Sequence, residues 1–243
     1  MTAALLEVEE LRAGYESGVD ILQGLSLAVA RGSITLVIGP NGAGKSTLLR
    51  TIFGFLKAQQ GDIRFDGAPI GALAPAAIKA LGIGYVPQEI NVFPLLTVEE
   101  NLRMGGWIFR REGARLKAAL RHVYDTFPAL APRRHEPAGA LSGGQGRMLS
   151  IAREMMAAPK LMLVDEPTAG LAPALVEQVY DLLHTVRRSV GSTILLVDQN
   201  IEDAVRQADQ VYLVDLGRVR AQGPAREFPP ERVSALIKEC LLG

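Results

Sequence analysis

The stretch GPNGAGKST at residues 39–47 decides the expected fold class. It fits the pattern G-x-x-x-x-G-K-[ST] from Gly39 to Ser46, follows an apolar β-branched run at 34–38 and precedes a helix-compatible run at 48–52. A strand, a glycine-rich turn and a helix in this order are what a phosphate-binding loop requires. The alternative is a glycine-rich turn with an incidental lysine. We predict an α/β protein organised around a phosphate site.

The residue types of this stretch suit phosphate binding. Gly42 and Gly44 lack Cβ atoms, so successive backbone N–H groups can turn toward phosphate oxygens at the start of the next helix. Lys45 supplies a positive charge for the β- and γ-phosphates, and the Ser46 hydroxyl is suited to binding Mg²⁺. The expected binding set is Gly39, Asn41, Gly42, Ala43, Gly44, Lys45, Ser46 and Thr47.

Length and composition limit the classes of protein. The chain has 243 residues, of which 48% are hydrophobic, so it is not a disordered chain. Lys and Arg number 26, as do Asp and Glu, and this balance gives no support for binding to nucleic acid or anionic lipid. Cys240 is the only cysteine, so neither an intrachain disulfide nor a cysteine-only metal site can form, and we interpret it as a small apolar filler. We expect no signal peptide, because the first 15 residues lack a basic start, and no membrane span, because no apolar run approaches about 18 residues.

Hydrophobic patterns divide the chain into three parts. The first is β-rich, with strands expected at 5–11, 22–29, 34–38, 62–65 and 83–86. The second, at about 89–157, is a mainly helical insertion, with a capping box from Thr97 to Glu100 and helical spacing at 115–127. The third alternates strands and helices as a parallel sheet does, with strands at 161–164, 192–197 and 211–214 and helices at 175–188, 201–207 and 229–241. We predict one domain over 1–243, in which a helical subdomain is inserted after a β-rich subdomain.

Two adjacent carboxylates follow the apolar run at 161–164. A buried strand that ends in Asp165 and Glu166 aims both acids at the crevice where the phosphate loop also lies. We expect Asp165 to bind Mg²⁺ through water and Glu166 to orient and polarise an attacking water. A solvated strand end would explain the two acids in isolation, but their pairing with the phosphate loop favours a site.

The stretch LSGGQ at 141–145 opens a further helix. Ser142 and Gln145 form a capping box, which is a sufficient structural reason for both. Gly143 and Gly144, however, cost about 1 kcal/mol each relative to alanine in a helix. Two glycines in the first turn are explained if bare backbone N–H groups must approach an anion.

These motifs together resemble the ATP-binding cassette family. LSGGQ lies between GPNGAGKST and LMLVDEP (161–167) at family-like spacing, and the resemblance covers essentially the whole chain. It implies a P-loop ATPase that binds ATP and Mg²⁺ and works as a head-to-tail dimer with two nucleotides between the chains. It assigns Tyr15 to stacking on adenine, with an ordinary strand-edge tyrosine as the alternative, and Gln88 to the metal and the attacking water. It also implies that one segment covers the γ-phosphate bound by the opposite protomer, namely Ser142, Gly143, Gly144 and Gln145.

Two positions depart from the family pattern. Ala172 stands where an aspartate is common, and Gln199 stands where the family has its switch histidine. An amide can donate an N–H group to a γ-phosphate oxygen but cannot shuttle a proton, so Glu166 stays the expected base. The predicted catalytic set is Glu166, Lys45, Gln88 and Gln199, and the predicted metal set is Ser46, Gln88 and Asp165.

Four further runs limit the resemblance to particular subfamilies of importer ATPases; they lie at 93–102, 143–153, 169–173 and 197–200. They look like the ATP-binding subunits of branched-chain amino acid importers, and the urea and short-chain amide importers share the pattern. This implies a peripheral subunit on the cytoplasmic face of the inner membrane, with permease subunits, a second ATPase that is a paralogue or an identical chain, and indirectly a solute-binding protein. Residues 92–94 are a candidate docking edge or else a packed loop.

Two further hypotheses remain open at this point. An ATPase of the same superfamily that acts on DNA or the ribosome is disfavoured, because the chain has neither a long coiled-coil insertion nor a second cassette, and we expect no nucleic acid partner. A regulatory subunit with little turnover is suggested by Ala172 and Gln199, but the intact Lys45, Asp165 and Glu166 argue against it.

Overall fold

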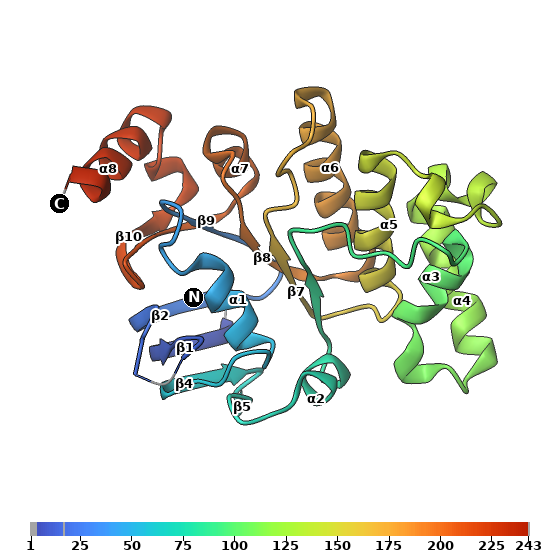
Figure 1. Cartoon of the computed structure of the whole chain (residues 1–243), viewed down its shortest axis with the longest axis horizontal. Helices are drawn as coiled ribbons and strands as arrows, with labels where there is room; N and C mark the ends of the chain where they lie inside the picture. The colour runs from blue at the N-terminus through green and yellow to red at the C-terminus, as the bar shows by residue number, and fades with distance from the viewer. Residues whose placement is uncertain (1–3, 17, 243) are drawn as a thin grey trace.

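The computed structural model describes residues 4–16 and 18–242 and contains two sheets (Figure 1). The larger has the strand order β10-β9-β3-β8-β7-β6, in which β10 is antiparallel to β9 and the other neighbours are parallel. Its central strands are buried along their whole length, as in sheets with both faces covered. The bounds are β3 (Ile34–Ile38), β6 (Ile83–Val86), β7 (Leu161–Asp165), β8 (Thr193–Val197), β9 (Gln210–Asp215) and β10 (Arg218–Pro224).

The smaller sheet is antiparallel and has the order β2-β1-β4-β5. Its strands are β1 (Ala4–Ala13), β2 (Leu22–Ala30), β4 (Gln60–Phe65) and β5 (Ala68–Pro69). One apolar cluster joins it to the larger sheet through helix α1 (Lys45–Ile52), because Leu6 of β1, Leu48 of α1 and Val37 of β3 are all fully buried there. The helix that follows the phosphate loop is thereby held between the two sheets.

Three helices gather at the end of the molecule farthest from α8 (Pro230–Leu242) (Figure 1). They are α3 (Val98–Gly105), α4 (Gly113–Thr126) and α5 (Gly143–Met155), joined by the short helices η1 (Trp107–Phe109), η2 (Pro128–Arg133) and η3 (Ala138–Ala140). The helices α3 and α5 pack closely, since a Cβ on Gly105 would lie 2.0 Å from the Arg153 carbonyl oxygen. The division of this region into a subdomain at 89–157 stays a prediction.

The remaining helices lie along the larger sheet or at the chain's C-terminal end. They are α2 (Pro75–Ala80), α6 (Pro173–Val190), α7 (Ile201–Gln207), the short η4 (Ala225–Glu227) and α8. Among the residues described, no helix has both the length and the apolar character that crossing a bilayer demands.

The predicted strands and long helices are present, and both capping boxes, at Thr97 and at Ser142, are formed. Besides the four short η helices, one α-helix and two strands were not predicted: α2, β5 and β10. β5 has only two residues and α2 only six, which is too short for a periodic pattern to be visible. β10 carries Arg218 and Arg220 on an edge, and it is a strand because it pairs with β9.

Candidate active site

The loop from Gly39 to Gly44 connects β3 to α1 and needs its glycines. Gly42 and Gly44 have φ values of 83° and 102°, in the left-handed region that side chains disfavour. A Cβ on Gly39 would lie 2.0 Å from the Val214 carbonyl oxygen, so the loop packs against β9 only with glycine there. Helix α1 begins after Gly44 without a side-chain cap, which leaves the first-turn N–H groups facing an anion site.

Lys45 is held by the loop that it follows. Its Nζ donates to the carbonyl oxygens of Gly39, at 2.9 Å, and Pro40, at 3.0 Å. Burial lowers the pKa of Lys45, while the nearby Glu166 and Asp165 carboxylates oppose that change. A cation with only carbonyl partners in a buried site is well suited to an incoming phosphate, which would satisfy its charge.

Asp165 ends β7 and accepts two hydrogen bonds. Ser46 Oγ donates to Oδ1 at 2.9 Å, and Tyr85 Oη donates to Oδ2 at 3.2 Å. Burial raises the pKa of Asp165, and these two bonds oppose the rise. Burial and the Asp165 charge raise the pKa of Tyr85 to about 12, which keeps its phenol a donor.

This pair of oxygens fits a magnesium site. Hydroxyl and carboxylate oxygens are the ligands that Mg²⁺ prefers. Within the described ranges no cluster of three His, Cys, Asp or Glu side chains could hold a metal. An ion beside Ser46 and Asp165 would take its other ligands from phosphate, from water and, as predicted from the sequence, from the side-chain oxygen of Gln88; a site that keeps several waters is usual for Mg²⁺.

Glu166 is fixed by two amide side chains. Gln88 Nε2 and Gln199 Nε2 each donate to its Oε2 at 2.7 Å. Its own N–H group donates to the Val197 carbonyl oxygen at 2.8 Å, and its φ of 43° is unusual for a residue with a side chain. Three residues predicted as catalytic thus meet at one carboxylate oxygen.

One pocket of about 360 Å³ unites most of the predicted residues. Tyr15 lies at its edge with 54% of its surface exposed, and its Oη accepts a hydrogen bond from Arg50 Nη1 at 3.0 Å. The volume is within the range of small-molecule sites. The lining residues are Tyr15, Ile21, Asn41, Gly42, Gly44, Lys45, Ser46, Thr47, Gln88, Glu166 and Gln199.

The LSGGQ segment is not part of this pocket. Ser142 Oγ accepts from the Gln145 N–H at 3.4 Å, and Gln145 Oε1 accepts from the Ser142 N–H at 3.1 Å, so both side chains cap α5. Ser142 and Gly143 are exposed. A role for this segment in the site of a second chain stays a prediction.

Sequence reasoning missed Asp198, which follows β8 as Asp165 ends β7. Its carboxylate is 1% exposed and accepts from Thr168 Oγ1 at 2.8 Å, from Tyr180 Oη at 3.2 Å and from the N–H groups of Gln199 and Asn200 at 2.7 and 3.0 Å. Burial raises the pKa of Asp198, and these hydrogen bonds oppose the rise. The signal was present, because an acid directly after a buried apolar strand at a sheet's carboxyl edge marks a site.

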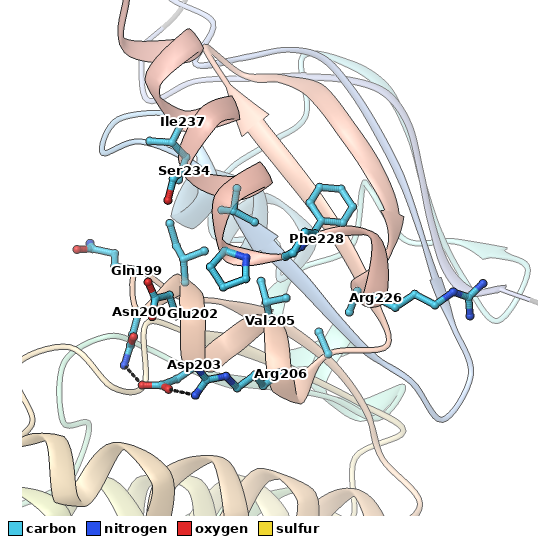
Figure 2. Close-up of a pocket in the computed structure, with 16 residues that line it drawn as sticks. Gln199, Asn200, Glu202, Asp203, Val205, Arg206, Arg226, Phe228, Ser234 and Ile237 are labelled. Atoms are coloured by element: carbon cyan, nitrogen blue, oxygen red, sulfur yellow. Dashed lines mark hydrogen bonds and ion pairs between the residues drawn. The ribbon is translucent and has the colours of Figure 1, made fainter.

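A larger pocket of about 710 Å³ lies between α7 and α8 (Figure 2). Apolar side chains such as Val205 and Phe228 line it, and Figure 2 shows Asp203 at its rim, bonded to Asn200 and Arg206. It contains none of the residues of the phosphate loop and shares only Gln199 with the smaller pocket. Chemistry rather than size therefore identifies the candidate site.

Comparison with known proteins agrees with this geometry. A family model described as "ABC transporter" matches residues 22–169. The chain is 40% identical over 205 residues to the high-affinity branched-chain amino acid transport ATP-binding protein BraG of Pseudomonas aeruginosa, covering 84% of this chain and 87% of the relative. It is 40% identical over 226 residues to the probable branched-chain amino acid transport ATP-binding protein LivF of Archaeoglobus fulgidus, covering 92% and 94%.

The fold has solved counterparts as well. The ADP conformation of MJ1267, an ATP-binding cassette of an ABC transporter, superposes with a TM-score of 0.86 at 29% identity and complete coverage of both chains. Because the family model matches more than half of the chain and the relatives are similar over nearly all of it, the chain belongs to the ABC transporter family, among its ATP-binding subunits.

Proposed function

We propose that the chain hydrolyses ATP to ADP and phosphate, and that this reaction energises the import of branched-chain amino acids. The observation that carries the proposal is the Glu166 carboxylate, hydrogen-bonded by Gln88 and Gln199 in the pocket that Lys45 and Ser46 also line. A base, a phosphate-binding cation and a hydroxyl that can bind a metal are the groups that phosphoryl transfer to water needs.

In this proposal each side chain acts at a defined atom. The Lys45 ammonium exchanges its two loop carbonyls for the β- and γ-phosphates. The two amides occupy Oε2 of Glu166, and Oε1 accepts no hydrogen bond from the part of the chain described, so Oε1 is available to orient a water and take its proton. Ser46, Gln88 and Asp165 would hold Mg²⁺, Asp165 through water, and the ion would neutralise charge on the phosphates.

The adenine end of the nucleotide is assigned to Tyr15. Its ring lies at the edge of the pocket and its hydroxyl is fixed by Arg50, so the ring is available for stacking at little cost in side-chain entropy. We propose that Ser142, Gly143, Gly144 and Gln145 bind the γ-phosphate held by a second ATPase chain in a head-to-tail dimer. The exposure of Ser142 and Gly143, and the absence of all four residues from the lining of this chain's own pocket, support that assignment.

Permease subunits are the proposed membrane partner, with the chain peripheral on the cytoplasmic face and a solute-binding protein engaged indirectly. Large apolar side chains are exposed near α3, and Leu95 is 93% exposed. Asn101 holds this edge, since its Oδ1 accepts from the Phe93 N–H at 2.7 Å and its Nδ2 donates to the Phe93 carbonyl oxygen at 3.0 Å. An ordered apolar edge favours docking; its exposed side chains are Ile90, Phe93, Leu95, Met104, Trp107 and Ile108.

The proposed import of branched-chain amino acids is supported by the names of the two relatives that match at 40% identity over most of their length. The pocket itself binds nucleotide and gives no contact to the solute. The solute is therefore tested by reconstitution with the permease in vesicles, where uptake of leucine, isoleucine and valine should depend on internal ATP.

The reaction is tested by substituting Glu166. Glu166→Gln should lower the turnover number by about a hundredfold or more, because the general base is lost, while ATP still binds. Lys45→Ala should instead weaken binding of ATP. Matched controls are Glu177→Gln on α6 and Lys117→Ala on α4, whose side chains are exposed and do not line the pocket. Unchanged turnover in Glu166→Gln would overturn the assignment of the base.

A further inference from the structure

Arg147 lies in α5, two residues beyond the LSGGQ segment, and only 3% of it is exposed. Its Nη1 donates to the Pro87 carbonyl oxygen at 2.9 Å, and its Nη2 donates to the Gln88 carbonyl oxygen. Both acceptors belong to the segment whose Gln88 side chain is bonded to Glu166. A single side chain of α5 thus donates two hydrogen bonds to the backbone at a proposed catalytic residue and its neighbour.

The same guanidinium is also influenced by the charge of Asp198, whose carboxylate orients the second amide that contacts Glu166. Burial lowers the pKa of Arg147, and the charge of Asp198 opposes that change, so the two groups interact electrostatically. Asp198 in turn accepts from the N–H group of Gln199 at 2.7 Å. Arg147 therefore holds the backbone that carries Gln88 by hydrogen bonds, and its charge also acts on the carboxylate that orients Gln199.

A purely structural role does not explain this placement. Burying a guanidinium costs more free energy than burying an apolar side chain of similar size, and the Nε of Arg147 has no hydrogen-bond partner in the described part of the chain. The two bonds that offset this cost go to adjacent carbonyls of one segment, not to the walls of the core. The free-energy cost of burying Arg147 is explained if the activity of the protein depends on the position of the segment that carries Gln88.

We propose that Arg147 is a positioning residue that couples α5 to the Gln88–Glu166 hydrogen bond. The LSGGQ segment forms the start of α5, so a shift of this helix on the nucleotide of a second chain is passed through Arg147 to the backbone of Gln88 and then to Glu166. Hydrolysis would thereby depend on engagement of the partner. The inference rests on the proposed ATPase function.

The kinetic test uses Arg147→Met, Arg147→Lys, Gln88→Ala and the double variant Arg147→Met/Gln88→Ala in the full chain. Arg147→Met should lower kcat about tenfold and leave KM for Mg-ATP within about twofold, because the pocket itself is untouched. Arg147→Lys should recover part of kcat, since an ammonium can still reach one carbonyl. The double variant should be no slower than Gln88→Ala alone. Arg147 acts through Gln88, so its substitution has no further effect on kcat once the Gln88 side chain is removed.

A second readout does not depend on turnover. Hydrogen exchange within residues 88–93, read at the Phe93 N–H group that donates to Asn101 Oδ1 at 2.7 Å, should be at least about tenfold faster in Arg147→Met than in the wild-type chain. The reason is that Arg147 no longer holds the backbone of this segment. The matched control is Lys79→Met, which removes the 2.7 Å partner of the buried Glu154 carboxylate and should lower stability without faster exchange at 88–93. Additive kinetic losses, or exchange at 88–93 that is unchanged, would overturn the proposal. If the wild-type chain does not hydrolyse ATP, the proposed function fails, and the exchange result alone decides the role of Arg147.

Discussion

The Glu166 carboxylate accepts hydrogen bonds from two side chains, of which Gln88 matches the family pattern and Gln199 departs from it. Gln88 was expected near the metal and the attacking water, Gln199 stands where the family has its switch histidine, and both donate to Oε2 at 2.7 Å. An amide stays neutral and keeps its N–H donor at every physiological pH, so Gln199 cannot pass a proton onward. In the proposed reaction the proton of the attacking water therefore stays with Glu166 until product leaves, and no pH dependence near pH 6.5 should come from this position.

Asp165 makes stability depend on pH. Burial raises its pKa above the ordinary value of 3.8, so the folded chain binds this proton more tightly than the unfolded chain. Its contribution to stability is then present at low pH and is lost as the pH rises through the folded-state pKa. We expect the free energy of unfolding of Asp165→Asn, relative to that of the wild-type chain, to increase from about pH 4 to about pH 8. Urea denaturation of both proteins without Mg²⁺ measures this difference.

The control for this measurement is Asp181→Asn, an exposed carboxylate on α6. Its difference from the wild-type chain should not vary with pH, because the carboxylate that it removes is exposed to water. Titrating groups that the two proteins share, such as Asp198, cancel in the comparison. A difference between Asp165→Asn and the wild-type chain that is flat over this pH range would contradict the prediction.

The residues that could be predicted from the sequence were those that belong to contiguous motifs. Lys45, Ser46, Asp165 and Glu166 were found because each follows or precedes an apolar run that marks its position in the fold. Tyr85 was missed, since its bond to Asp165 joins residues 80 positions apart. Only the parallel pairing of β6 with β7 brings those two together, and no local pattern records it.

At the level of elements, α6 begins without a cap. Ala172 has the extended backbone of an N-cap residue, with φ −64° and ψ 146°, but its methyl group cannot accept a hydrogen bond. Ala172→Asp should stabilise the chain by about 1 kcal/mol, because the carboxylate caps the first turn and favours the positive end of the helix dipole. For a chain of this length that is a rise in Tm of about 2–4 °C.

Two further variants check the cap. Ala172→Asn should give a similar gain, since the two side chains are equally good caps and only one is charged. Ala235→Asp, at an exposed position inside α8, should lower stability, because aspartate disfavours helix interiors. If Ala172→Asp is no more stable than the wild-type chain, α6 does not begin at this residue in solution.

Helices and strands were predictable where the interactions that form them join residues close in the sequence. The capping boxes at Thr97 and Ser142 were visible because both partners lie within four residues. β10 was missed although its positions alternate between exposed and half-buried or buried, because its run RVRAQGP contains one β-branched residue and its register is set by β9. Propensity alone therefore finds helices and buried strands but not an edge strand that exists through its partner.

For the whole molecule, the distribution of the proposed site is the informative feature. The phosphate loop, Glu166 and Tyr15 share one pocket, whereas the LSGGQ segment caps α5 outside that pocket, with Ser142 and Gly143 exposed. A chain that carries both halves of a site in separate places can complete the site only with another chain, and a head-to-tail pair of identical chains would complete two. The structure of a single chain cannot reveal this pairing through burial, so it was inferred from the sequence resemblance.

Glu166→Gln should trap that pair. Without a base the variant binds Mg-ATP and does not hydrolyse it, so light scattering with size exclusion should report a shift from 26.1 kDa to about twice that mass when Mg-ATP is added. The control is Glu166→Gln/Gly143→Asp. A Cβ on Gly143 meets nothing within 4 Å, so the chain still folds and binds ATP, but the added carboxylate would face the partner's γ-phosphate and should keep the chain monomeric. A Glu166→Gln chain that binds ATP and stays monomeric would contradict pairing of identical chains and make the second cassette a different protein.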